Sequence, residues 1–201
     1  LLLIVMIAFM VSANLSKLLE TNRWVEHTYK AIDIGKGITG SLVNMETGFR
    51  GYLVVGDEKF LEPFVMGRKD FTELMAKAKE TVSDNPAQVE RLREIESMKA
   101  KWLKEHVNIA MEFRREANAG SRSTANIANF LNKGIGKGYM DGMRAILDDF
   151  VSAEAALIVT RGEEQIATAS STSNVTTWGA IIAVILGTLV AYIITRMITK
   201  P

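Results

Sequence analysis

The stretch AIDIGKGITGSLVNMETGFRGY, residues 31–52, decides the fold. Its small and apolar residues recur at alternating steps of four and three positions, which is the heptad pattern of a long packed helix. The pattern consists of Ala31, Gly35, Ile38, Leu42, Met45, Phe49 and Tyr52. Gly56 is a suitable C-terminal cap, so we expect this helix to run from Lys17 to Val55.

Three further segments carry the same periodicity, and together they predict an all-α protein. We expect helices over residues 58–82, 86–117 and 137–177, with a short helix at 126–132 inside a glycine-rich loop. The sequence predicts an antiparallel up-down-up-down four-helix bundle. The expected buried positions are Phe60, Phe64, Gly67, Phe71, Leu74, Ala78 and Val82, then Val89, Leu92, Ile95, Trp102, His106, Ile109 and Phe113, then Tyr139, Met143, Ile146, Phe150, Ala153 and Leu157.

Apolar runs at both ends of the chain predict two transmembrane helices. We expect the first at residues 1–16, truncated at its N-terminus, and the second at residues 178–195. Arg196 and Lys200 follow the second run at once, so the C-terminus should be cytoplasmic and the domain between the spans, residues 17–177, extracytoplasmic. A cleavable signal peptide is the alternative reading of the first run.

Composition and motifs argue against several classes of function. The net charge of +1 is unsuited to nucleic-acid binding, and no cysteine is present for disulfides or thiolate sites. The glycines of residues 35–40 match a dinucleotide-binding pattern, but they fall inside a helical heptad, where close packing explains them better. His27 and His106 lack a second histidine at helical spacing, so we expect no metal, no cofactor and no catalytic site. A partly buried His106 could report pH.

Several motifs resemble one known family. The sequence WVEHT at residues 24–28, ETGFRGYLVVGD at 46–57 and FLEPF at 60–64 resembles the third subclass of CHASE-type sensory domains, and the resemblance extends through Trp102 to residues 144–161. Val55 departs from the threonine often found there. The residues that carry the family signature are Glu46, Gly48, Arg50, Gly51, Tyr52, Leu53, Gly56, Glu154 and Arg161.

The resemblance implies the extracytoplasmic input of a bacterial receptor in the inner membrane. Residues 196–201 look like the start of a HAMP linker, which would pass the signal to cytoplasmic partners through a part of the protein beyond Pro201. We expect a methyl-accepting chemotaxis protein that senses a ligand or a binding protein. A histidine kinase or cyclase is the alternative, and a non-signalling scaffold for a protein partner is a more remote one.

Arg50 is the one candidate ligand-binding residue. It follows Glu46 by one helical turn, so the simpler interpretation is an intrahelical ion pair. The sharper interpretation is that Arg50 binds an anion, or a carboxylate of another helix such as Asp141 or Asp148.

A ladder of small residues in the second apolar run predicts close helix packing in the membrane. Gly179, Ala183, Gly187 and Ala191 recur every four positions, and the ladder could face a second copy of the chain or the first span, where Ala8 and Ser12 share the spacing. We expect a parallel homodimer in the lipid bilayer.

Overall fold

The computed structural model describes the backbone of residues 2–199 and the side chains of residues 5–199, and every regular element in this part is helical. The predicted all-α class is therefore confirmed. The elements are α1 (Leu2–Val55), the 3-10 helix η1 (Glu58–Leu61), α2 (Glu62–Thr81), α3 (Pro86–Trp102), the π-helical turn η2 (Leu103–Val107), α4 (Asn108–Asn118), α5 (Thr124–Leu131) and α6 (Ile135–Thr199). Three residues of the expected membrane span and linker, Leu1, Lys200 and Pro201, lie outside the described residues.

The chain divides into two compact units. The core unit is His27–Ala156, and the terminal unit combines Leu1–Glu26 with Leu157–Pro201. The expected domain limits, residues 17–177 for the sensor and 178–195 for the second span, stay predictions.

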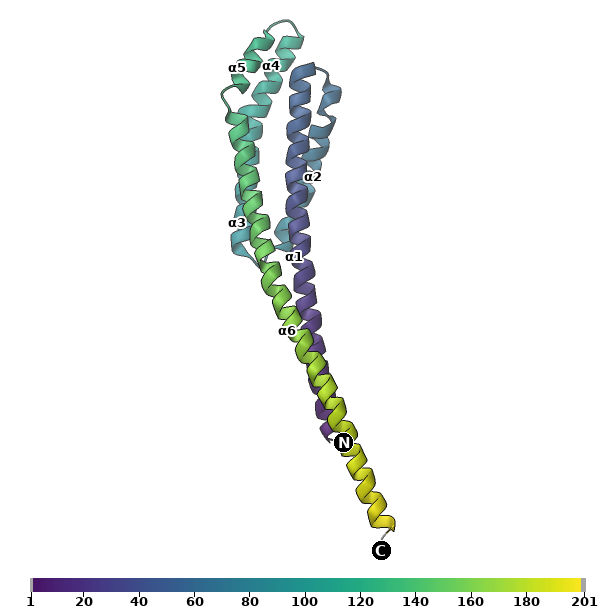
Figure 1. Cartoon of the computed structure of the whole chain (residues 1–201). Helices are drawn as coiled ribbons and strands as arrows, with labels where there is room; N and C mark the ends of the chain where they lie inside the picture. The colour runs from purple at the N-terminus through teal and green to yellow at the C-terminus, as the bar shows by residue number, and fades with distance from the viewer. Residues whose placement is uncertain (1, 200–201) are drawn as a thin grey trace. The chain divides into compact units, whose positions relative to one another are not determined.

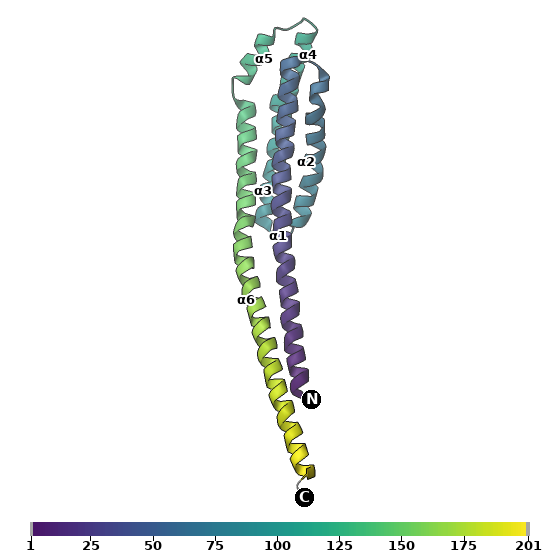
Figure 2. The same ribbon diagram turned by 45° about the vertical axis from the view of Figure 1, so that its right-hand side comes forward.

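The core unit is built around one hydrophobic cluster. The C-terminal part of α1, the helix α2, the run α3–η2–α4 and the N-terminal part of α6 lie side by side around it (Figures 1 and 2). Its largest fully buried side chains include Trp102, Tyr52, Phe71 and Phe150. All seven expected positions of residues 31–52 are buried. The heptad pattern thus identified the inner face of α1 correctly.

Glycines end two of the helices and precede a third. The Gly56 N–H donates to the Tyr52 carbonyl at 2.8 Å, and its φ of +81° closes α1. Gly120 and Gly134 also have positive φ, after α4 and just before α6. These are backbone conformations that glycine adopts without steric cost.

Close approach of α1 and α2 depends on two other glycines. A Cβ atom added to Gly48 would lie 2.4 Å from the Phe64 backbone nitrogen, and one added to Gly67 would lie 2.6 Å from the Ser41 carbonyl oxygen. Any larger residue at Gly48 would have to push the two helices apart, because backbone atoms cannot rotate away.

The third predicted helix is not one continuous α-helix. The π-helical turn η2 interrupts it, and an extra residue in that turn shifts the following positions around the helix axis. Ile109 is therefore 38% exposed, whereas Ala110 and Met111 are buried. The prediction that Ile109 lies in the core was wrong for this reason.

Two other boundaries differ from expectation. Phe60 lies in the 3-10 helix η1 and is 46% exposed, so the buried pattern of the second helix begins at Phe64. The helix α6 begins at Ile135, before the start expected at residue 137, and it therefore includes Gly136.

The terminal unit pairs the N-terminal part of α1 with the C-terminal part of α6. The Arg161 guanidinium lies over the Trp24 ring at 4.8 Å, and a Cβ atom on Gly179 would contact the Ile7 side chain at 3.0 Å. Among the residues described, α6 is a helix long and apolar enough to cross a membrane, with a window of mean hydropathy 2.3. The first expected span, residues 1–16, stays a prediction.

Candidate functional site

A cavity of about 590 Å³ lies in the core unit, where α1 ends and α6 begins. One wall is the last part of α1, with Phe49 and Leu53, and another is the short helix α5, with Ile127 and Leu131. The remaining walls come from α3, η2, α4 and the first turn of α6. The volume is within the range of small-molecule sites, about 300–1,000 Å³.

Three aromatic rings line the cavity and pack against one another: Phe49, Trp102 and His106. The Phe49 ring meets the Trp102 ring edge to face at 6.0 Å and the His106 ring at 5.6 Å. The His106 ring also stacks on Phe130 at 5.3 Å. These contacts connect α1, α3, η2 and α5 through one set of packed rings.

His106 lines the cavity as a buried, neutral imidazole. It is 5% exposed, and its Nδ1 atom has no hydrogen-bond partner. Burial lowers the pKa of His106 below its usual value, the charge of Arg50 lowers it further, and Glu46 opposes both. A Cβ atom on Gly136 would lie 2.1 Å from Nε2, so only glycine lets the first turn of α6 pack against this ring.

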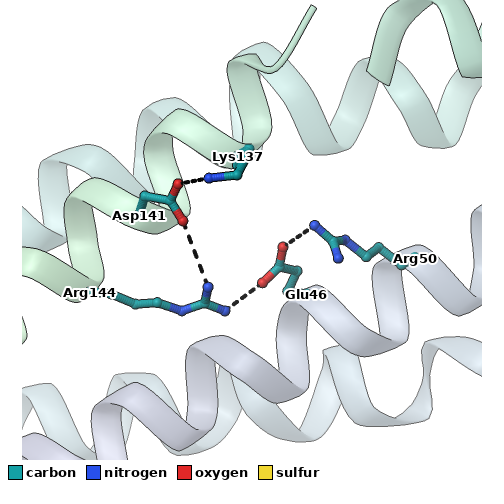
Figure 3. Close-up of polar contacts among 5 residues, drawn as sticks. All are labelled: Glu46, Arg50, Lys137, Asp141 and Arg144. Atoms are coloured by element: carbon teal, nitrogen blue, oxygen red, sulfur yellow. Dashed lines mark hydrogen bonds and ion pairs between the residues drawn. The ribbon is translucent and has the colours of Figure 1, made fainter. Parts of the chain in front are cut away.

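Five charged side chains beside the cavity form one network between α1 and α6 (Figure 3). Glu46 accepts from Arg50 on its own helix and from Arg144 on α6, each at 2.6 Å. Arg144 also lies 3.9 Å from Asp141, which is hydrogen-bonded to Lys137. The hydrogen bond from Lys137 is the main cause that lowers the pKa of Asp141.

The structure contains the intrahelical ion pair expected for Arg50, and anion binding by Arg50 stays a prediction. Arg50 pairs with Glu46, and the ion pair between helices comes from Arg144 instead of from a contact of Arg50 with Asp141 or Asp148. The Arg50 side chain is 64% exposed, whereas that of Glu46 is 13% exposed. Glu46 is therefore the centre of the network, and Arg50 is paired with it at the solvent-exposed edge.

Sequence reasoning missed Arg114. This residue of α4 lines the cavity, yet it forms no ion pair among the described residues, and its buried Nε atom has no hydrogen-bond partner. No periodic or motif signal identified it, because its neighbours in the cavity belong to other helices.

Most of the signature residues have structural roles. Tyr52 and Leu53 are buried in the core, Gly48 and Gly51 lie against α2 and η1, and Gly56 caps α1. Glu154 is 2% exposed and accepts a hydrogen bond from Gln88 Nε2 at 2.8 Å. Arg161 belongs to the terminal unit.

The small-residue ladder does not have one environment. Gly179 is buried against Ile7 of the same chain, whereas a Cβ atom on Gly187 would meet no heavy atom within 4 Å. Ala183 is partly buried and Ala191 is exposed. Gly187 and Ala191 are therefore left uncovered in this chain, and the homodimer stays a prediction.

The described residues contain no group of three or more His, Asp or Glu side chains placed to hold a metal ion. The cavity is instead suited to an organic ligand, because aromatic and aliphatic walls surround a few polar groups.

In a comparison with protein families, the model of the CHASE3 domain matches residues 21–164. No curated protein and no solved structure matches the chain.

Proposed function

Because the chain belongs to the CHASE3 family of extracytoplasmic sensory domains, we propose that it is the input module of a bacterial chemotaxis transducer. Domains of this family are sensory and not catalytic, and they occur in chemoreceptors and histidine kinases. In this proposal the cavity beside Glu46 binds the ligand that the receptor senses. Ligand binding then changes the position of α1 relative to α6 inside the core unit.

The observation that carries this proposal is that residues of both α1 and α6 line the cavity. Phe49 and Leu53 come from α1, and Gly136 and Lys137 come from the first turn of α6. A ligand in the cavity contacts both helices, so any preference for one spacing of α1 and α6 shifts the population toward that spacing. Both helices continue without interruption toward the two ends of the chain.

We propose the inner membrane of a bacterium as the location. Residues 178–195 of α6 would span it, residues 1–16 would be a second span, and residues 196–201 would begin a HAMP linker on the cytoplasmic side. Single cysteines at Ser83 and Thr199, placed in this cysteine-free chain, test the topology. A membrane-impermeant maleimide should label Ser83→Cys in intact cells and Thr199→Cys only after lysis. The opposite pattern would overturn the proposed topology.

A disulfide between α1 and α6 tests signalling without knowledge of the ligand. A Cβ atom on Gly35 would lie 3.0 Å from Val151 Cγ2, which is near enough for cysteines at these two positions to pair. In a chimera with the cytoplasmic half of a chemoreceptor, oxidation of Gly35→Cys/Val151→Cys should change the swimming response, and a reductant should restore it. Each single cysteine variant is the control. Complete crosslinking without any change in output would contradict the proposal.

A histidine kinase is the second candidate, because the same family supplies the input of these enzymes. The chain that follows Pro201 distinguishes the two: a methyl-accepting helical hairpin indicates the transducer, and a kinase core indicates the alternative.

A further inference from the structure

One cation of the cavity has no acidic partner. Arg50 is paired with Glu46, and Lys137 is paired with Asp141. Arg114 forms no ion pair within residues 2–199, and its Nε atom is buried without a hydrogen-bond partner. A buried donor left unpaired costs free energy, so an anion supplied from outside would stabilise this arrangement.

The rest of the cavity is suited to an apolar group. Leu53, Ile127 and Leu131 line it on two sides, and Trp102 lies on a third. The remaining buried polar group is the His106 imidazole, which is uncharged at neutral pH because burial lowers its pKa. A ligand with a second negative charge would have to bury that charge without a partner, which is costly.

We propose that the cavity binds a small organic monocarboxylate, whose carboxylate pairs with the Arg114 guanidinium and whose apolar body lies against Leu53, Ile127 and Leu131. The planar guanidinium can donate two parallel hydrogen bonds to a carboxylate, which gives orientation as well as affinity. The His106 Nδ1 atom offers one more hydrogen bond to a polar substituent. This inference rests on the proposed function, which makes the same cavity the input site.

Matched pairs of acids and amides test the assignment. Phenylacetate and 4-methylpentanoate are titrated into the full chain in lipid nanodiscs, beside phenylacetamide and 4-methylpentanamide, and binding is followed by calorimetry and thermal melting. We expect the acids to bind and to raise the melting temperature, and the amides to bind at least about tenfold more weakly, since the charge-assisted pair is lost.

Variants locate the binding site. Arg114→Gln should weaken binding of the acids at least about tenfold and remove the difference between acid and amide. Arg115→Gln is the matched control, because Arg115 follows on the same helix, is 56% exposed and lies outside the cavity lining. Ala128→Phe fills the cavity from α5 without a change of charge, and should also block binding. Circular dichroism verifies that each variant remains helical.

Three outcomes overturn the inference: no binding of either acid, equal binding of acid and amide, or unchanged binding in Arg114→Gln. None of them affects the disulfide test between Gly35 and Val151. If oxidation of the Gly35→Cys/Val151→Cys chimera changes its output but the chain binds no carboxylate, the sensory proposal stands and the ligand class is rejected. Carboxylate binding in a chain whose output ignores the disulfide supports the site and rejects the signalling proposal.

Discussion

Arg144 Nη2 donates to Glu46 Oε2 at 2.6 Å, and this hydrogen bond joins α6 to α1 across 98 positions of sequence. Glu46 is 13% exposed and also accepts from Arg50, so its carboxylate has two charged donors. Charge-assisted hydrogen bonds of this kind are shorter and stronger than neutral ones. The pair is therefore a specific polar contact between α1 and α6, both of which line the cavity.

We expect Arg144→Gln to lower the free energy of unfolding by about 1 kcal/mol, because the bond to Glu46 is lost but Arg144 is partly exposed to solvent. Arg50→Ala should cost less, about 0.3–0.5 kcal/mol, as an exposed pair one helical turn apart. Denaturant melts of both variants and of the parent measure the difference. An Arg50→Ala effect larger than that of Arg144→Gln would show that Arg50 has a second role.

Gly48→Ala should destabilise the core unit by about 1–3 kcal/mol, because the new methyl group would clash with the Phe64 backbone nitrogen and push α1 away from α2. Gly40→Ala is the matched control in the same helix. A Cβ atom there has no neighbour within 4 Å, so the better helix propensity of alanine should raise stability by about 0.5–1 kcal/mol. Thermal melts that shift in the same direction for both variants would contradict this packing argument.

Glu154→Ala should lower the free energy of unfolding by about 1–3 kcal/mol, because the buried Gln88 amide loses an acceptor. Glu154→Gln should be much milder, since its amide oxygen can still accept from Gln88 Nε2. A double-mutant cycle with Gln88→Ala isolates the coupling between the two side chains. Additive effects in the cycle would mean that the hydrogen bond of 2.8 Å contributes no stability.

The low pKa of His106 predicts a loss of stability in acid. Between the folded pKa and the usual value of about 6.5, the unfolded chain binds a proton that the folded chain does not, so stability falls as pH decreases below about 6.5. After burial, the charge of Arg50 also disfavours the imidazolium, whereas Glu46 favours it; Arg114 and Lys137 line the same cavity. His106→Gln should flatten the dependence of the melting temperature between about pH 5.5 and pH 7.5. If the melting temperatures of the parent and of His106→Gln fall in parallel as the pH decreases, His106 is not the cause of the loss of stability in acid.

The expected homodimer can be tested at the small-residue ladder of residues 179–191. Single cysteines through residues 178–192 should crosslink between subunits with helical periodicity, with the strongest crosslinking at Gly187 and Ala191. Gly187→Leu should reduce dimer formation, because close approach in lipid depends on small residues. Gly179→Leu should instead disturb the contact with Ile7 inside one chain. Equal crosslinking at every position would reject a defined helix interface.

Periodicity predicted the helices because helix packing repeats over short distances in the sequence. The buried face of residues 31–52, the cap at Gly56 and the start of a helix at residue 86 all depend on neighbours within about one or two turns, which a sequence pattern records. The π-helical turn η2 escaped prediction, since one extra residue in a helix has no composition signal and is stabilised by packing. The exposed position of Ile109 follows from that turn.

The candidate site was predictable only in part. Glu46 and Arg50 stand one turn apart in the sequence, so their pairing could be foreseen from spacing alone. The contact of Glu46 with Arg144, and the position of Arg114 in the cavity, depend on which helices become neighbours. The sequence by itself determined the helical class and the inner face of α1 over residues 31–52. Only the tertiary structure decided which charges meet and which cation remains unpaired, because such contacts form between segments that are distant along the chain.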